Sequence, residues 1–146
     1  MFFGLLYVPL RSQVDMRELN MIYRMIDSSK TQADMNYYSY QLSKFWSDRL
    51  EQIEQKIIRQ MRKGDKIKFK KSMGQWRSHV ESMSELRSTL FKKDFINPRY
   101  YQFNSFESKV TRSKKGTLMQ PFIYNMSKAL YYEDKWVELD VLFNSN

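Results

Sequence analysis

Apolar residues recur at helical spacing through most of this chain. They are most regular between residues 66 and 90, where they stand three, four or seven positions apart: Phe69, Met73, Trp76, Val80, Met83 and Leu90. An α-helix with about 3.6 residues per turn brings such positions onto one face. The pattern therefore predicts a helix over residues 66–90 whose apolar face is buried, with Trp76 at its centre.

Two more helices are predicted before this one. The first follows a cap at Ser12-x-x-Asp15 and ends near Asp27. A second capping box, Ser29-x-x-Gln32, then opens a long helix. Its apolar positions keep helical spacing, with no Gly or Pro between them: Met35, Tyr38, Leu42, Phe45, Trp46, Leu50, Ile53, Ile57 and Met61.

The remaining signals concern the turns and the last helix. Lys63-Gly64-Asp65 predicts a turn, so the second and third helices would form an antiparallel hairpin. Residues 94–115 are rich in aromatics without a clear period and indicate an irregular crossover. Thr117-x-x-Gln120 opens a last helix with Pro121 in its first turn. The predicted fold class is all-α: a single-domain helical bundle of about four helices with a long antiparallel helical hairpin.

The first ten residues, MFFGLLYVPL, are apolar. They lack the positive region and the cleavage site of a signal peptide, and they are too few to span a bilayer. Two interpretations remain open, a segment that packs on the body and the remnant of an export signal. The predicted organisation is an apolar N-terminal segment, 1–14, followed by one helical domain, 15–146, with no transmembrane segment.

Positive charge is the most distinctive feature of the composition. The 146 residues carry a formal net charge of +9. Such an excess favours an anionic partner, such as nucleic acid, an acidic membrane surface or an acidic protein, but it also serves solubility alone. The charge is densest from Lys56 to Arg77, where nine Lys or Arg stand against one acid, Asp65. Five of these residues form the candidate partner-binding site: Lys66, Lys68, Lys70, Lys71 and Arg77.

The residue inventory gives little support to catalysis. The single histidine, His79, is interpreted as a surface or boundary residue. The chain has no cysteine for a disulfide or a thiolate metal site, and its four scattered glycines form no phosphate-binding loop. Carboxylate pairs such as Asp48 with Glu51 lie at helical spacing beside basic residues and are interpreted as solvated surface. The chain is therefore predicted not to be an enzyme, and to need no cofactor, metal or small-molecule substrate.

Three blocks of the sequence resemble a known family. Residues 31–36, TQADMN, with Leu50 nineteen positions after Thr31, are similar to an opening T-Q-x-E-M-N and a later leucine. Residues 69–85 place Trp76 on the tryptophan of L-x-x-x-Q-x-x-W-x-x-x-R-x-x-x-C. Gly116-Thr117 with Pro121 matches G-T-x-x-x-P, and the last matches follow at Leu130, Lys135 and Leu139. The blocks span about three-quarters of the chain and resemble the LprI-type domain, a small helical bacterial module named after a lysozyme inhibitor.

The departures from this family are also systematic. Its cysteines fall at Tyr38, Ser84 and Met126, its glutamine at Met73 and its arginine at Val80. The chain therefore resembles a divergent, cysteine-free member in which packing replaces the bridges. The resemblance implies a non-catalytic, protein-binding role and an envelope, periplasmic or exported setting, with a cytoplasmic one as the alternative.

Lysozyme inhibition, the activity that names the family, conflicts with the charge of this chain. Lysozymes of the usual type are cationic, and two basic proteins repel each other at encounter and at the interface. We therefore expect weak or no inhibition of a cationic lysozyme. The leading hypothesis is a helical module that binds an acidic protein partner through its basic helical face. The alternative is binding of nucleic acid or of an acidic membrane surface by the same face.

Overall fold

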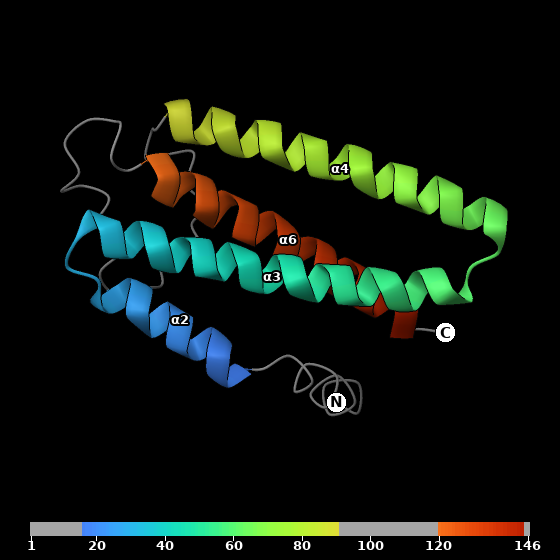
Figure 1. The fold of residues 1–146 in the computed structure, drawn as a ribbon, viewed down its shortest axis with the longest axis horizontal. Coiled ribbons are helices and arrows are strands. Elements are labelled where there is room, and N and C mark those ends of the chain that lie inside the picture. Colours follow the sequence, from blue (N-terminus) through green and yellow to red (C-terminus); the bar gives the residue numbers. More distant parts are fainter. Residues whose placement is uncertain (1–15, 91–119, 145–146) are drawn as a thin grey trace.

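The computed structural model describes residues 16–90 and 120–144. These residues form four helices: α2 (Met16–Ser28), α3 (Gln32–Gln60), α4 (Lys63–Leu90) and α6 (Gln120–Asn144) (Figure 1). The described ranges contain no strand, so the predicted all-α class is confirmed. The cap at Ser12-x-x-Asp15, the segment 1–14, the crossover 94–115 and the cap at Thr117 lie outside these ranges.

The start of α3 differs from the prediction by two residues. The cap is Thr31, whose hydroxyl oxygen accepts a hydrogen bond from the backbone N–H of Asp34 at 3.1 Å. Ser29 was the expected cap, but its hydroxyl donates to the carbonyl of Met25 and so closes the end of α2. Both residues stand three positions before a polar side chain, and Thr31 takes the cap because its backbone is extended directly before the helix.

The turn between α3 and α4 also lies earlier than predicted. The chain turns at Met61 and Arg62, and α4 begins at Lys63. Met61 is extended, and its N–H donates to the carbonyl of Ile58. The predicted turn residues Gly64 and Asp65 instead form the first turn of α4, where a carboxylate is favoured by the helix dipole. The turn therefore does not depend on the glycine.

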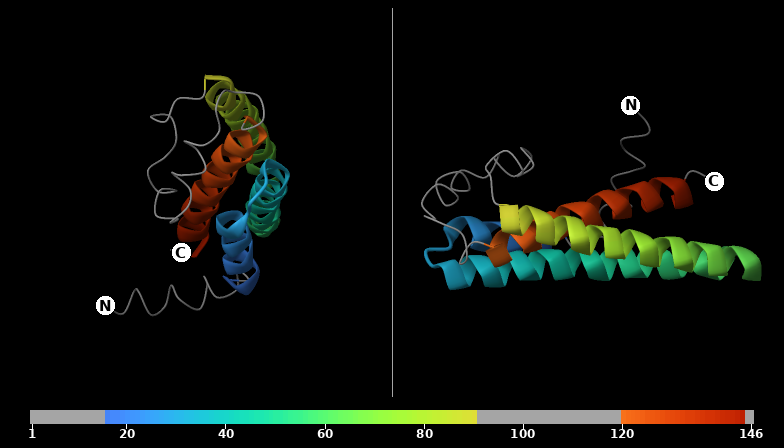
Figure 2. Two further views of the ribbon diagram at one scale, coloured as in Figure 1. Left: turned by 90° about the vertical axis from the view of Figure 1, so that its left-hand side faces the viewer. Right: turned by 90° about the horizontal axis from the view of Figure 1, so that it is seen from above.

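The helices form a bundle in which α6 lies between α3 and α4 (Figures 1 and 2). α6 runs parallel to α3 and antiparallel to α4, and both pack chiefly against it. α3 and α4 are antiparallel neighbours in sequence, as predicted, but they make little backbone contact with each other. α2 packs on α3 through its buried Leu19, Ile22 and Ile26. α3 and α4 thus do not pack closely against each other as the predicted hairpin would, because α6 lies between them.

Small polar residues let α3 and α6 approach closely. Ser39 is fully buried, and the side-chain amide of Asn125 donates to its hydroxyl at 3.2 Å and to the carbonyl of Asn36 at 3.2 Å. Further along, the rings of Trp46 and Trp136 lie 5.8 Å apart between centroids. Both contacts pair residues about 90 positions apart, at 36–46 on α3 and at 125–136 on α6, and so fix the parallel arrangement.

Trp76 is less buried than the apolar stripe predicts. Met73 and Val80 are buried, whereas Trp76 and Phe69 are only partly covered at the edge of the core. The ring of Trp76 lies 5.8 Å from that of Tyr132 and 5.2 Å from the ammonium of Lys135. The stripe is narrower than its sequence suggests because α4 packs mainly against one helix. The predicted burial of this face therefore holds at Met73 and Val80, whereas Trp76 is only partly buried.

A polar cluster joins α4 to α6 beside this edge. The phenol of Tyr124 donates to the carboxylate of Glu81, and the ammonium of Lys128 lies 3.2 Å from the same carboxylate. The hydrogen bond from Tyr124 lowers the pKa of Glu81, while burial and that bond raise the pKa of Tyr124. Near neutral pH, Glu81 is thus charged and Tyr124 protonated, as a structural clamp requires.

Candidate functional site

The five predicted binding residues lie in the first half of α4 but do not share one face. Lys68, Lys70 and Lys71 are exposed, whereas Lys66 and Arg77 are partly buried. Lys70 and Arg77 line a groove of about 400 Å³ between α3 and α4, and Lys68 and Lys71 point to other sides of the helix. The set therefore divides into four lysines that form no ion pair among the described residues and one arginine, Arg77, that is bonded inside the protein.

Arg77 is engaged inside the protein. Its guanidinium donates two hydrogen bonds to the carboxylate of Glu54 on α3, one of them 3.0 Å long. Glu54 is only 7% exposed. This two-point ion pair bridges α3 and α4 where the two backbones are apart. Arg77 therefore holds α4 against α3, and we call its ion pair with Glu54 the strut. Its guanidinium is not available to a partner.

Breaking this strut should destabilise the fold measurably. Changing Arg77 to Gln leaves the Glu54 carboxylate buried without its partner, which usually costs about 3–5 kcal/mol. Because the Arg77 side chain is 36% exposed, we expect a smaller loss of about 1–3 kcal/mol. Urea unfolding of Arg77→Gln, Glu54→Gln and the double variant measures the coupling. If the two single losses simply add up in the double variant, the strut does not exist.

The remaining charge gathers at the end of the α3–α4 hairpin. We call this region the basic tip and define it by the basic side chains of residues 56–71: Lys56, Arg59, Arg62, Lys63, Lys66, Lys68, Lys70 and Lys71. Among the described residues, none of them forms an ion pair. Figures 1 and 2 show this end projecting past the end of α6. The charge is thus free to act on a partner.

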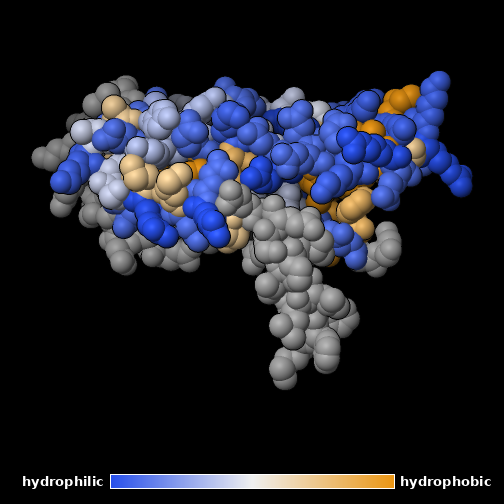
Figure 3. Space-filling model, turned by 60° about the horizontal axis from the view of Figure 1, so that its bottom comes forward, coloured by the Kyte–Doolittle hydropathy of each residue, from blue (hydrophilic) through white to orange (hydrophobic). Residues whose placement is uncertain are grey.

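The basic tip also carries an apolar residue that the sequence analysis left out. Ile67 is 62% exposed, and three lysines stand one helical turn away from it: Lys63, Lys70 and Lys71. Figure 3 shows hydrophobic spots set among hydrophilic surface at this end of the molecule. In the sequence, Ile67 lies outside the apolar stripe and within a run of lysines. The basic tip thus combines an apolar centre, Ile67, with a rim of cations.

Other candidate chemistry of the sequence lies on the surface. His79 is exposed, as predicted. Asp48 pairs with Lys44 one turn earlier at 2.8 Å, which agrees with a solvated face. Within residues 16–90 and 120–144, no group of three or more His, Asp or Glu side chains could hold a metal ion. No helix in these ranges is long and apolar enough to cross a membrane.

Comparisons with known proteins do not assign this arrangement to a family. No family model, no curated protein and no solved structure matches the chain.

Proposed function

We propose that the chain is a non-catalytic helical module that binds an acidic protein partner through the basic tip. The observation that carries the proposal is Ile67, exposed and surrounded by unpaired lysines. Protein interfaces commonly bury a few apolar anchors inside a polar rim that excludes water. A partner with an apolar pocket edged by carboxylates matches both parts of this surface.

Phosphate polymers and acidic membranes are the second candidate. The eight unpaired cations of the basic tip favour them, because each cation that neutralises a phosphate releases a counterion. A phosphate polymer offers no apolar pocket for Ile67, whereas the acyl region of a membrane would bury it. Ile67 therefore separates a protein partner from a polymer, but not from a membrane.

The resemblance to the LprI-type domain remains part of the proposal. Two of the positions where that family has cysteines, Ser84 and Met126, are buried in this chain. Burial at both positions supports a scaffold whose bridges were replaced by packing. The resemblance carries the expectation of a protein partner, and the charge argument against a cationic lysozyme is unchanged.

The first test is a pull-down from native lysate with the full chain, with and without nuclease, at low and moderate salt. We expect a discrete acidic protein that survives nuclease and a rise to about 150 mM salt. Recovery of nucleic acid that is lost on nuclease treatment would overturn the proposal in favour of the second candidate. The binding of a polymer should also fall log-linearly with salt concentration.

Charge reversal at the basic tip provides the matched variants. Lys68→Glu with Lys71→Glu should lower the affinity for the captured partner at least about tenfold, since both like charges now oppose its carboxylates. Arg24→Glu with Lys30→Glu makes the same charge change on exposed residues away from the tip and should leave binding unchanged. Equal losses in the two pairs would mean that only the net charge matters.

Replacing Ile67 tests the apolar centre. Ile67→Ser keeps every charge and should still lower the affinity for the protein partner about tenfold, as truncation of a central anchor does. Titration with the partner at two salt concentrations measures this loss. Unchanged affinity would show that the partner recognises only the charges of the basic tip and not Ile67.

A further inference from the structure

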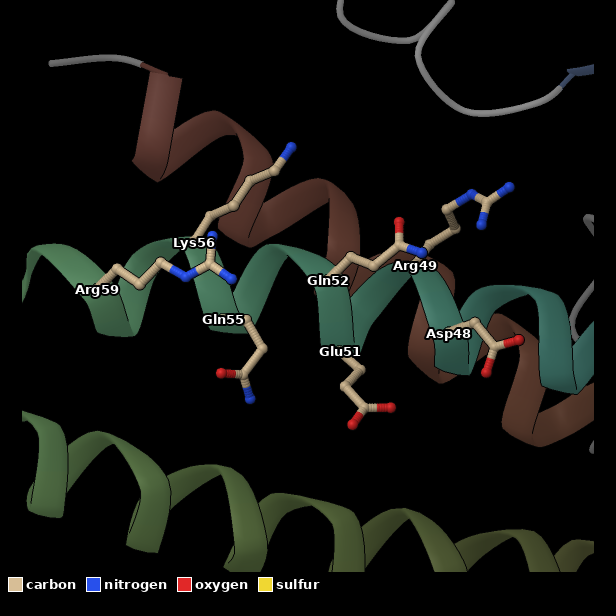
Figure 4. Close-up of a pocket in the computed structure, with 7 residues that line it drawn as sticks. All are labelled: Asp48, Arg49, Glu51, Gln52, Gln55, Lys56 and Arg59. Carbon is tan, nitrogen blue, oxygen red and sulfur yellow. The ribbon is translucent and has the colours of Figure 1, made fainter.

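The flank of α3 carries a second cationic feature that joins the basic tip. A groove of about 580 Å³ lies along α3, and its described lining is Asp48, Arg49, Glu51, Gln52, Gln55, Lys56 and Arg59 (Figure 4). Lys56 and Arg59 belong to the basic tip, and Arg49 lies one heptad before Lys56. The groove thus extends the cationic surface away from the tip, along the helix.

The charges in the groove are unevenly distributed. Figure 4 shows Arg49 and Lys56 pointing to one side of α3, and Asp48 and Glu51 pointing to the other. Asp48 is already neutralised by Lys44. The side that holds Arg49 and Lys56 therefore carries two cations with the amide of Gln52 between them, and Arg49 also faces Glu18 of α2.

Arg49 is held in place before any partner arrives. Its guanidinium carbon lies 4.7 Å from the centroid of the Phe45 ring, and one terminal nitrogen lies 3.8 Å from a carboxylate oxygen of Glu18 on α2. Its side chain is only 19% exposed, and its Nε–H is buried without a hydrogen-bond partner. A partner's carboxylate would therefore bind at the terminal nitrogens, and because the guanidinium is already held in place the entropic cost is low.

The spacing of the cations identifies the shape of the ligand. Arg49 and Lys56 are seven residues apart, about 10.5 Å along α3, and Arg59 follows after about 4.5 Å more. An acidic residue and a second one seven positions later lie on one face of a helix at the same separation. Charged residues at such positions pair across neighbouring helices in coiled coils.

We infer that this groove receives an acidic helix of the protein partner, lying along α3 with carboxylates opposite Arg49, Lys56 and Arg59. The inference rests on the proposed function and adds the secondary structure and the charge spacing of the partner. The described lining of the groove carries three cations, Arg49, Lys56 and Arg59, against two carboxylates, Asp48 and Glu51. Charge complementarity selects the acidic helix.

The test uses synthetic alanine-rich peptides of about 20 residues, long enough to form helix in water. One peptide carries glutamates at positions i, i+7 and i+10, the order that matches α3 in a parallel arrangement. A second carries them at i, i+3 and i+10, the antiparallel match. A third has the same composition with glutamates at i, i+6 and i+12, which point to three different sides of the helix. Each is titrated with the full chain by fluorescence anisotropy at low salt.

One of the matched peptides should bind about three- to tenfold more tightly than the third, as two or three surface ion pairs allow. Lys56→Gln with Arg59→Gln should remove this preference, whereas Lys68→Gln with Lys71→Gln on α4 should keep it. Equal binding of all three peptides would overturn the inference, as would an equal effect of the two double variants.

Two further outcomes also decide against the acidic helix. A single-stranded oligonucleotide that displaces the preferred peptide and itself loses affinity in Lys56→Gln with Arg59→Gln would assign the groove to a phosphate backbone. Light scattering that shows a dimer lost in this variant would assign it to a second copy of the chain. If the native partner still depends on Lys68 and Lys71 while the peptides show no preference, the proposed function stands and only this inference fails.

Discussion

Trp46→Ala is expected to lower the free energy of unfolding by about 3–5 kcal/mol, the usual cost of truncating a buried aromatic side chain. Trp46 is buried where α3 meets α6, edge-on to Phe45 and 5.8 Å from Trp136. Its removal leaves a cavity that the two helices can close only by moving together. Urea unfolding followed by circular dichroism measures the loss.

Two controls make this experiment specific. Trp46→Phe should cost much less, because it keeps most of the ring and removes an indole N–H that is buried without a hydrogen-bond partner. Trp76→Ala should cost about 1–2 kcal/mol, since Trp76 is only partly buried. A larger loss for Trp76 than for Trp46 would contradict the insertion of α6 beside α3.

Ser39→Leu is expected to destabilise the fold by about 2–5 kcal/mol. Ser39 is fully buried on α3 and hydrogen-bonded to Asn125 of α6, so an added side chain must push the helices apart. The change also deprives the amide of Asn125 of one acceptor, which adds the cost of an unsatisfied buried donor. Thermal or urea unfolding measures the combined loss of unfolding free energy.

The matched control is Ser39→Ala. It adds no volume and removes the same hydroxyl, which donates to the carbonyl of Asn36 and accepts from the amide of Asn125. It should cost only about 1–2 kcal/mol. The difference in unfolding free energy between Ser39→Leu and Ser39→Ala gives the cost of the added side-chain volume. If Ser39→Leu is no worse than Ser39→Ala, α3 and α6 are not in close contact at this position.

The layout of the bundle separates the buried core from the basic tip. The buried residues lie along α6 and the helices around it, whereas the basic tip extends beyond the end of α6. Lysines of the tip have few packing neighbours, so their reversal should change binding without unfolding the protein. Arg77 is the exception, because it stands at the boundary and bonds to Glu54.

Several predictions from the sequence came close to the structure. The helical stretches were found because their apolar spacing extends over many turns, and α3 ends one residue before the last position of its predicted stripe. The positions of turns and caps were less accurate. At Ser29 and Thr31, two side chains of similar chemistry competed for one cap, and only the local backbone conformation decides such a case.

The predicted binding residues divide in the same way. Lys66, Lys68, Lys70 and Lys71 form a dense run that the sequence shows directly, because charge density is a property of neighbouring positions. Arg77 was grouped with them because it is basic and near in sequence. Its partner Glu54 stands 23 positions earlier, on another helix, and no local pattern joins the two.

The sequence by itself determined which segments are helical and where positive charge concentrates, since periodicity and charge density are local properties of the chain. Only the tertiary structure decided which apolar faces meet. An amphipathic helix buries its stripe equally well against many partners, so the placement of α6 depends on the fit of residues such as Ser39 and Asn125 across two helices. That placement leaves Trp76 partly exposed, sets α3 and α4 apart where Arg77 bonds to Glu54, and leaves the basic tip beyond the end of α6.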